Sequence, residues 1–160
     1  MSKLTTCLWF DTQAEAAAEL YVGVFREAGL DASIDQVSRY GDTGPGPKGS
    51  VLTVAFTLDG HRVMGLNGGP HFTLSPAASL VIDTRDQAET DFFWDRLQRG
   101  GGEPSQCGWL TDRFGVSWQV VPLALREMMA GVPAGAERLM AALMKMTKLD
   151  IAELERAYAG

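Results

Sequence analysis

Residues 1–122 predict the same order of elements twice, and this repetition limits the possible folds more than any other feature. Each half has a strand, a helix and then three strands. Asp11-Thr12-Gln13-Ala14-Glu15-Ala16 lies at the first strand-to-helix junction, and Asp83-Thr84-Arg85-Asp86-Gln87-Ala88 lies at the second. Residues 59–64 and 114–119 correspond in the same way at the last hairpin of each half. Capping residues recur in unrelated helices, but two matched junctions in matched order favour a duplication.

The duplication predicts an α+β fold built from two βαβββ modules. We expect the modules to occupy residues 1–75 and 76–122 and to form one domain. After Pro122 the composition shifts towards Ala, Leu and Met, which predicts a helical C-terminal extension over residues 123–160.

The spacing of apolar residues, with Gly and Pro at the breaks, gives the expected bounds of the elements. In the first half they are strands at Leu4–Phe10, Ile34–Tyr40, Ser50–Leu58 and His61–Leu66, a helix from Thr12 to Gly29, and a mobile loop at Gly41–Gly49. In the second half they are strands at Ala78–Ile82, Glu103–Gln106, Trp109–Asp112 and Val116–Val121, and a helix at Asp86–Arg99. Helices follow at Leu123–Ala130, at Ala136–Met146 and from Asp150 onward.

Three of these helices begin with the capping-box spacing, in which a short polar side chain accepts a hydrogen bond from a backbone N–H three residues later. The pairs are Thr12 with Glu15, Asp86 with Glu89, and Asp150 with Glu153. The C-terminal helices carry an apolar stripe that includes Leu139, Met140, Leu143 and Met144. Such a stripe is either a surface for a partner or a packing face, and packing is the more common role.

The segment QCGWLTDRFGVSWQVVP, residues 106–122, is typical of a β-hairpin because its residues alternate with a period of two. Gly115 stands where the turn needs a positive φ. On this pattern Gln119 shares a face with Ser117 and Val121, and we expect that face to line a cavity.

Charge and composition exclude several classes of partner. The net charge of −6, without a run of Lys or Arg among aromatics, argues against a nucleic-acid surface. No apolar run approaches the roughly 20 residues that span a bilayer, which argues against a membrane partner. The N-terminus lacks the apolar core of a signal peptide, so we expect a cytoplasmic protein. Cys7 and Cys107 are far apart in the sequence, and we expect free thiols.

The chain resembles the PhnB-like group of the vicinal oxygen chelate superfamily, which includes glyoxalases, extradiol dioxygenases, and fosfomycin and bleomycin resistance proteins. PhnB-like members often carry the label 3-demethylubiquinone-9 3-methyltransferase. The resemblance covers nearly the whole chain, and its two Trp-bearing motifs are specific. The matching residues are Leu8-Trp9-Phe10-Asp11, residues 64–70 (MGLNGGP), Phe93-Trp94, Gln106-Cys107-Gly108-Trp109-Leu110, residues 114–119 (FGVSWQ), and the tail from Met144 to Ile151.

The resemblance implies the glyoxalase/bleomycin resistance/dioxygenase fold, in which each module curls its mixed sheet into half a funnel around a cavity. It also implies a homodimer, because two chains often build that cavity. Superfamily enzymes place His or Glu ligands on the first and last strands of the modules. These positions correspond to Thr6, Met64, Ala78 and Gln119 in this chain. A neutral amide is a weaker metal ligand than a carboxylate, and the other three are not usual ligands, so we expect no metal.

No other cofactor is expected either. The first strand ends in Phe-Asp-Thr-Gln and lacks the Gly-rich strand-to-helix turn at which S-adenosylmethionine normally binds. The methyltransferase label therefore has no basis in the residues.

The expected ligand is a small molecule, and its site should combine aromatic walls with a few polar groups. The candidate residues are Gln119, Trp9, Trp109, Trp118, Asn67, His71 and Thr6. Any single Trp is more often a core residue, and a structural histidine is more common than a functional one. The turn at Asn67-Gly68-Gly69 could also offer backbone N–H groups to an anion. No catalytic residue is identified.

Three functions remain open. The first, which we favour, is a metal-free protein that binds a small molecule. The second is a metal-dependent enzyme of the superfamily, a lyase, dioxygenase or transferase, that uses Gln119 or His71. The third is an interaction protein whose C-terminal helices bind a partner.

Overall fold

The computed structural model describes residues 3–160 and divides into two compact units, with the boundary between Leu74 and Ser75. Unit 1 contains β1 (Thr6–Phe10), α1 (Ala14–Glu27), β2 (Ala32–Arg39), β3 (Val51–Leu58) and β4 (His61–Asn67). Unit 2 contains β5 (Ser79–Thr84), α2 (Gln87–Leu97), β6 (Glu103–Pro104), β7 (Trp109–Thr111) and β8 (Ser117–Pro122), followed by α3 (Leu123–Met129), α4 (Pro133–Leu143) and α5 (Ile151–Ala159).

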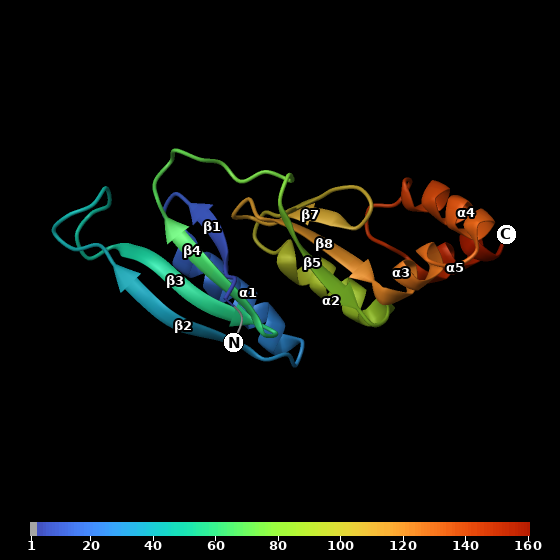
Figure 1. The fold of residues 1–160 in the computed structure, drawn as a ribbon, viewed down its shortest axis with the longest axis horizontal. Helices are drawn as coiled ribbons and strands as arrows, with labels where there is room; N and C mark the ends of the chain where they lie inside the picture. Colours follow the sequence, from blue (N-terminus) through green and yellow to red (C-terminus); the bar gives the residue numbers. More distant parts are fainter. Residues whose placement is uncertain (1–2) are drawn as a thin grey trace. The chain divides into compact units, whose positions relative to one another are not determined.

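Each unit contains one four-stranded mixed sheet, and the two sheets have the same topology (Figure 1). The strand orders are β1-β4-β3-β2 and β5-β8-β7-β6. In each sheet the first strand pairs in parallel with the last strand of its module, and the other pairs are antiparallel. The α+β fold with two βαβββ modules is therefore confirmed. That residues 1–122 form a single domain with a funnel stays a prediction.

One helix covers one face of each sheet. In unit 1, Tyr21 and Phe25 of α1 are buried against strand residues such as Phe56 and Val63. In unit 2, Phe93 and Leu97 of α2 are buried on the side of the sheet that carries Leu110, Trp118 and Val120. Since side chains alternate along a strand, the residues between these buried ones point to the other face, which we call the open face.

The start of α1 corrects one expectation. The N-cap residue is Gln13, and no side chain within residues 3–160 caps the helix in the expected Thr12–Glu15 manner. Instead, Asn67 Oδ1 at the end of β4 accepts a hydrogen bond of 2.9 Å from Ala14 N–H. The other two capping expectations are confirmed, since Asp86 Oδ1 accepts from Glu89 N–H and Asp150 Oδ1 accepts from Glu153 N–H.

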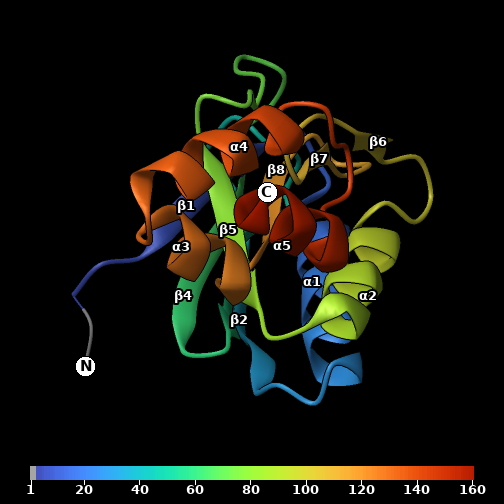
Figure 2. The same ribbon diagram turned by 90° about the vertical axis from the view of Figure 1, so that its right-hand side faces the viewer.

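The C-terminal helices α3, α4 and α5 pack on one another at the end of unit 2 (Figure 2). Their shared core consists of Leu125, Leu139, Met146, Leu149 and Leu154. Backbone hydrogen bonds from Cys107 N–H and Gly108 N–H to the carbonyls of Met146 and Thr147 join the tail to the hairpin that carries β7. The apolar stripe thus has a packing role, although Met140 and Met144 stay exposed. Within residues 3–160 no helix is both long and apolar enough to cross a bilayer.

Candidate functional site

The open face of the second sheet brings Gln119 and Trp109 together. The strand register pairs Val81 of β5 and Trp109 of β7 with Gln119 of β8, so the three form one row across the sheet. Ser79, Ser117 and Thr111 form the adjacent row by the same register. The expectation that Gln119 shares a face with Ser117 is therefore confirmed, and this face combines apolar with polar groups.

The hydroxyl of Ser117 lacks a hydrogen-bond partner. Ser117 is only 3% exposed, and its Oγ is the one buried side-chain oxygen or nitrogen atom in the described part of the chain without a partner. Beside it, Gln119 Nε2 donates a hydrogen bond of 2.9 Å to Ser79 Oγ. A buried hydroxyl without a partner costs about 1–3 kcal/mol, so such an atom in a folded protein needs an explanation.

Trp118, which the sequence predicts as a wall of the site, lies on the other face of the sheet. Adjacent residues of a strand point to opposite faces, so Trp118 points towards α2 when Gln119 points away from it. Its side chain is 1% exposed, and its Nε1 donates to Asp112 Oδ2. Trp118 is therefore a core residue of unit 2.

The strand positions that carry metal ligands in the superfamily do not fit a metal in this chain. Thr6 lies on the α1 side of the first sheet, with its Oγ1 3.1 Å from His61 Nε2, and so does not reach the open face. Met64 lies on the open face, and Ala78 precedes β5. Gln119 is thus the only oxygen donor of the four on an open face. Among residues 3–160, no three His, Cys, Asp or Glu side chains are close enough to hold an ion.

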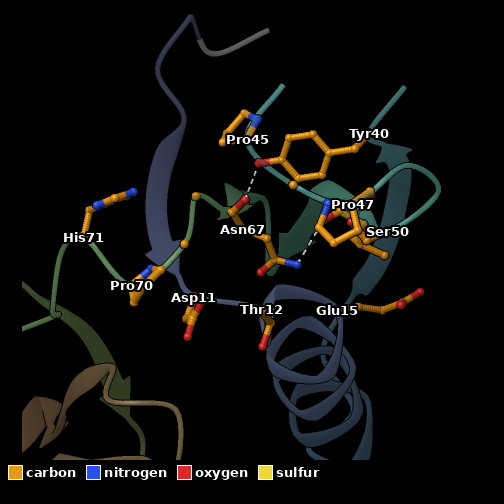
Figure 3. A pocket seen from close by; sticks show the side chains of 14 residues that line it. Asp11, Thr12, Glu15, Tyr40, Pro45, Pro47, Ser50, Asn67, Pro70 and His71 are labelled. Atoms are coloured by element: carbon orange, nitrogen blue, oxygen red, sulfur yellow. Dashed lines mark hydrogen bonds between the residues drawn. The ribbon is translucent and has the colours of Figure 1, made fainter. Parts of the chain in front are cut away.

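A cavity of about 410 Å³ lies in unit 1, where β1 and β4 end and α1 begins (Figure 3). Two candidate residues, Asn67 and His71, line it. The loop after β2 contributes Pro45 and Pro47 to the opposite wall, next to Tyr40. The cavity is lined within unit 1 and does not include the rows around Gln119.

Asn67 has a structural role at this cavity. Its Oδ1 accepts from Ala14 N–H, its Nδ2 donates to Val51 O at 3.1 Å, and its backbone oxygen accepts from Tyr40 Oη at 2.6 Å. The adjacent turn does not offer an anion site, because Gly68 N–H donates to Phe10 O and Gly69 N–H donates to Asp11 O. The expectation of free N–H groups in this turn is therefore wrong.

Trp9 and Cys7 lie on the open face of the first sheet, because Leu8 and Phe10 point towards α1. Trp9 Nε1 donates to Gly69 O at 2.9 Å, and its ring meets Phe72 edge to face at 4.9 Å between centroids. Partial burial raises the pKa of the Cys7 thiol. Cys7 and Cys107 are both free, as expected.

The sequence did not identify Asp11, Glu15 and Tyr40 as residues of a cavity. Asp11 and Glu15 looked like junction and capping residues, and Tyr40 looked like the end of a strand. The Gly- and Pro-rich segment Gly41–Gly49 was the available signal, since loops of this composition often border binding sites.

Comparisons with known proteins agree with the fold. The family model described as 3-demethylubiquinone-9 3-methyltransferase matches residues 2–121. A PhnB protein from Bacillus cereus, described with the same methyltransferase name, is 32% identical, with a TM-score of 0.65 over 76% of this chain and 99% of its own. The fosfomycin resistance protein FosX from Mesorhizobium loti is 17% identical, with a TM-score of 0.56 over 82% of this chain and 100% of its own. None of the curated proteins compared with the chain matches it.

Proposed function

Because the chain belongs to the 3-demethylubiquinone-9 3-methyltransferase family, in its PhnB-like group, we propose that it binds a small molecule on the open face of the second sheet and does so without a metal. The observation that carries this proposal is the buried hydroxyl of Ser117, which has no partner in the described chain and lies beside Gln119. Because this oxygen is buried, a ligand reaches it only when neighbouring side chains move, and a hydrogen bond from that ligand would then remove the cost of leaving the hydroxyl unpaired.

The neighbouring groups favour a ligand with a polar head and an apolar body. Gln119 uses one Nε2 hydrogen on Ser79, which leaves its Oε1 and the second hydrogen for a ligand. Val81 is 46% exposed, and it forms an apolar row with Trp109 on either side of Gln119. Apolar walls with a few convergent polar groups are the usual composition of a small-molecule site. Trp118 and Thr6 take no part in this proposal, because both point to the helix side.

Metal-dependent chemistry is the alternative, and the donor set argues against it. Hard cations prefer carboxylate oxygens and transition metals also take imidazoles, whereas the superfamily positions supply one neutral amide on the open faces. We propose likewise that the methyltransferase activity in the family description is not that of this chain. Its β1–α1 junction at residues 11–13 contains no Gly, and its sheets are mixed rather than doubly wound.

The sharpest test uses Ser117→Ala, because binding and stability should change in opposite directions. In the ligand-free protein, the variant removes an unpaired polar atom and should raise the free energy of unfolding by about 1 kcal/mol. In a ligand screen by NMR, the variant should have a lower affinity for any compound that binds at β8. Ser105→Ala, at an exposed position, is the matched control. A Ser117→Ala protein with lower stability and unchanged binding would contradict the proposal.

Three further expectations complete the proposed function, and each has a direct measurement. Elemental analysis of the purified protein should find no stoichiometric Ni, Mn, Fe or Zn. Sedimentation should find a homodimer, and cell fractionation should place the protein in the cytoplasm. A stoichiometric metal would favour the enzyme instead.

A further inference from the structure

The cavity of unit 1 offers a second binding site that does not depend on the proposed function. All of its lining residues belong to unit 1, between Asp11 and His71, and they lie at the end of the first sheet next to the start of α1. The proposed ligand face is on unit 2, around Ser117 and Gln119. The two sites therefore share no residue, and each can be tested by itself.

The size and walls of the cavity suit a small organic molecule. Its volume of about 410 Å³ falls in the range of roughly 300–1,000 Å³ that ligand pockets occupy. Apolar surface comes from Tyr40, Pro45, Pro47, Val51 and Pro70. Figure 3 shows the first three of these across from the start of α1, where Asp11, Thr12 and Glu15 lie.

Several contacts hold the apolar wall in place. Tyr40 Oη donates to Asn67 O at 2.6 Å, and Tyr40 N–H donates to Ser50 O at 2.9 Å. Gly49 N–H donates back to Tyr40 O at 2.8 Å, which closes the loop. Gly46 lies flat against the ring, because a Cβ at this position would come within 2.3 Å of Tyr40 Cε2. The loop predicted to be mobile is thus anchored at its end and packed against Tyr40.

The polar groups around the cavity fall into two classes. The amide of Asn67 and the N–H groups of Gly68 and Gly69 are already bonded to the protein. The carboxylates of Asp11 and Glu15 have neither a hydrogen bond nor an ion pair within residues 3–160. Together with the Thr12 hydroxyl and the His71 imidazole, these two carboxylates are the lining groups left to meet a ligand.

The charge of the lining favours a cation. Among the described residues that line the cavity none is Lys or Arg, and His71 is the one basic side chain. The N-terminus of α1 contributes roughly half a positive charge, which does not offset two carboxylates. An anion would meet net repulsion here, whereas a protonated amine would meet net attraction.

We propose that this cavity binds a small organic cation, with its apolar body against the prolines and Tyr40 and its protonated amine towards the start of α1, where Asp11 and Glu15 make the potential negative. Coulomb attraction at the exposed mouth and burial of the apolar body both contribute to binding. Neither contribution requires the open face of unit 2.

Three probes of similar shape and different charge test this proposal: benzylamine, benzyl alcohol and benzoate. NMR titration of the full chain should show benzylamine binding with shifts at Val51 and Thr12. Benzyl alcohol should bind at least fivefold more weakly, and benzoate should not bind at that place. Equal affinity for all three probes, or shifts confined to β5 and β8, would overturn the proposal.

Two double variants distinguish the effect of these two carboxylates from the effect of the protein's net charge. The double variant Asp11→Asn with Glu15→Gln should lower the affinity for benzylamine about tenfold. The double variant Asp31→Asn with Glu19→Gln changes the net charge equally at exposed positions that do not line the cavity, and it should leave this affinity unchanged. Thermal unfolding checks that both double variants fold. Equal weakening in the two pairs would mean that only net charge matters, which overturns the assignment to this cavity.

Discussion

Trp118 Nε1 donates a hydrogen bond of 2.8 Å to Asp112 Oδ2, and both residues are almost completely buried, at 1% and 3% exposure. The other carboxylate oxygen, Oδ1, accepts from Phe114 N–H at 2.8 Å and Val116 N–H at 3.1 Å. One carboxylate therefore closes the turn of the β7–β8 hairpin and fixes the first part of β8. Because Trp118 is held on the α2 side, Gln119 points to the open face.

Asp112→Ala should be among the most destabilising changes in unit 2. It removes the acceptor of three N–H groups in a buried turn, and the expected loss is about 3 kcal/mol of unfolding free energy. Chemical denaturation measures this loss. The control Asp31→Ala removes an exposed carboxylate and should stay within about 0.5 kcal/mol of the parent. Similar stability of the two variants would show that the turn does not depend on Asp112.

Gly68→Ala should destabilise unit 1 by overpacking. A Cβ at Gly68 would come within 2.2 Å of Trp9 Cζ2, so the indole has to move and its hydrogen bond to Gly69 O is disturbed. The expected cost is about 1–3 kcal/mol. Thermal unfolding measures it, with Gly41→Ala as the control because its Cβ would meet open space. Equal melting temperatures would be incompatible with this packing.

Gln87 joins the start of α2 to the C-terminal tail, and Gln87→Ala should loosen that tail. Its Nε2 donates to Leu149 O at 3.0 Å and to Asp91 Oδ1 at 2.9 Å, and its Oε1 accepts from Ile151 N–H at 2.8 Å. Loss of the two bonds to the tail should cost about 1–2 kcal/mol and increase hydrogen exchange in α5. Gln98→Ala, on the same helix, loses a hydrogen bond to Trp94 O instead and should leave exchange in α5 unchanged. Faster exchange in both variants would indicate a general effect on α2.

Asp91 gives the attachment of the tail a pH dependence. A hydrogen bond from Lys148 lowers the pKa of Asp91 from its usual value of 3.8, and the same bond raises the pKa of Lys148. Since the folded state has the lower carboxyl pKa, this stabilisation is present above pH 3.8 and is lost as the pH falls through the folded-state pKa.

Asp91→Asn should therefore reduce stability at pH 7 by no more than about 0.5 kcal/mol, because both side chains are partly exposed and water screens the pair. The difference from the parent protein should shrink in acid, which denaturation at pH 7 and below pH 3 would show. A stability difference between variant and parent that grows in acid would contradict the expected pH dependence.

Gln119→Glu tests whether the open face of unit 2 is prepared for a metal. Its neighbours in the two rows are Val81, Trp109, Ser79, Ser117 and Thr111, which add no carboxylate or imidazole. Calorimetric titration with Mn²⁺ or Ni²⁺ should give the same weak affinity for the variant and the parent protein. Stoichiometric binding at micromolar metal concentration by the variant would mean that other side chains complete the site.

Where the controlling interaction is local, the sequence was a reliable guide. Asp86 and Asp150 each cap a helix through an N–H three residues away, so sequence spacing alone predicts the bond. Thr12 has the same spacing to Glu15, yet Asn67 binds the first N–H of α1 instead. Asn67 is far away in the sequence, and only the parallel pairing of β1 with β4 places it there.

The sequence by itself determined the repeated βαβββ order, the hairpin turns at Asp59-Gly60 and Gly115, and the face that Gln119 shares with Ser117, because periodicity and turn chemistry act over a few residues. Tertiary structure alone decided that Asn67 caps α1, that the Ser117 hydroxyl is buried without a partner, and that Asp11, Glu15 and Tyr40 meet at one cavity. These features depend on side chains that strand pairing and loop closure bring together from distant positions, and no local pattern encodes such distances.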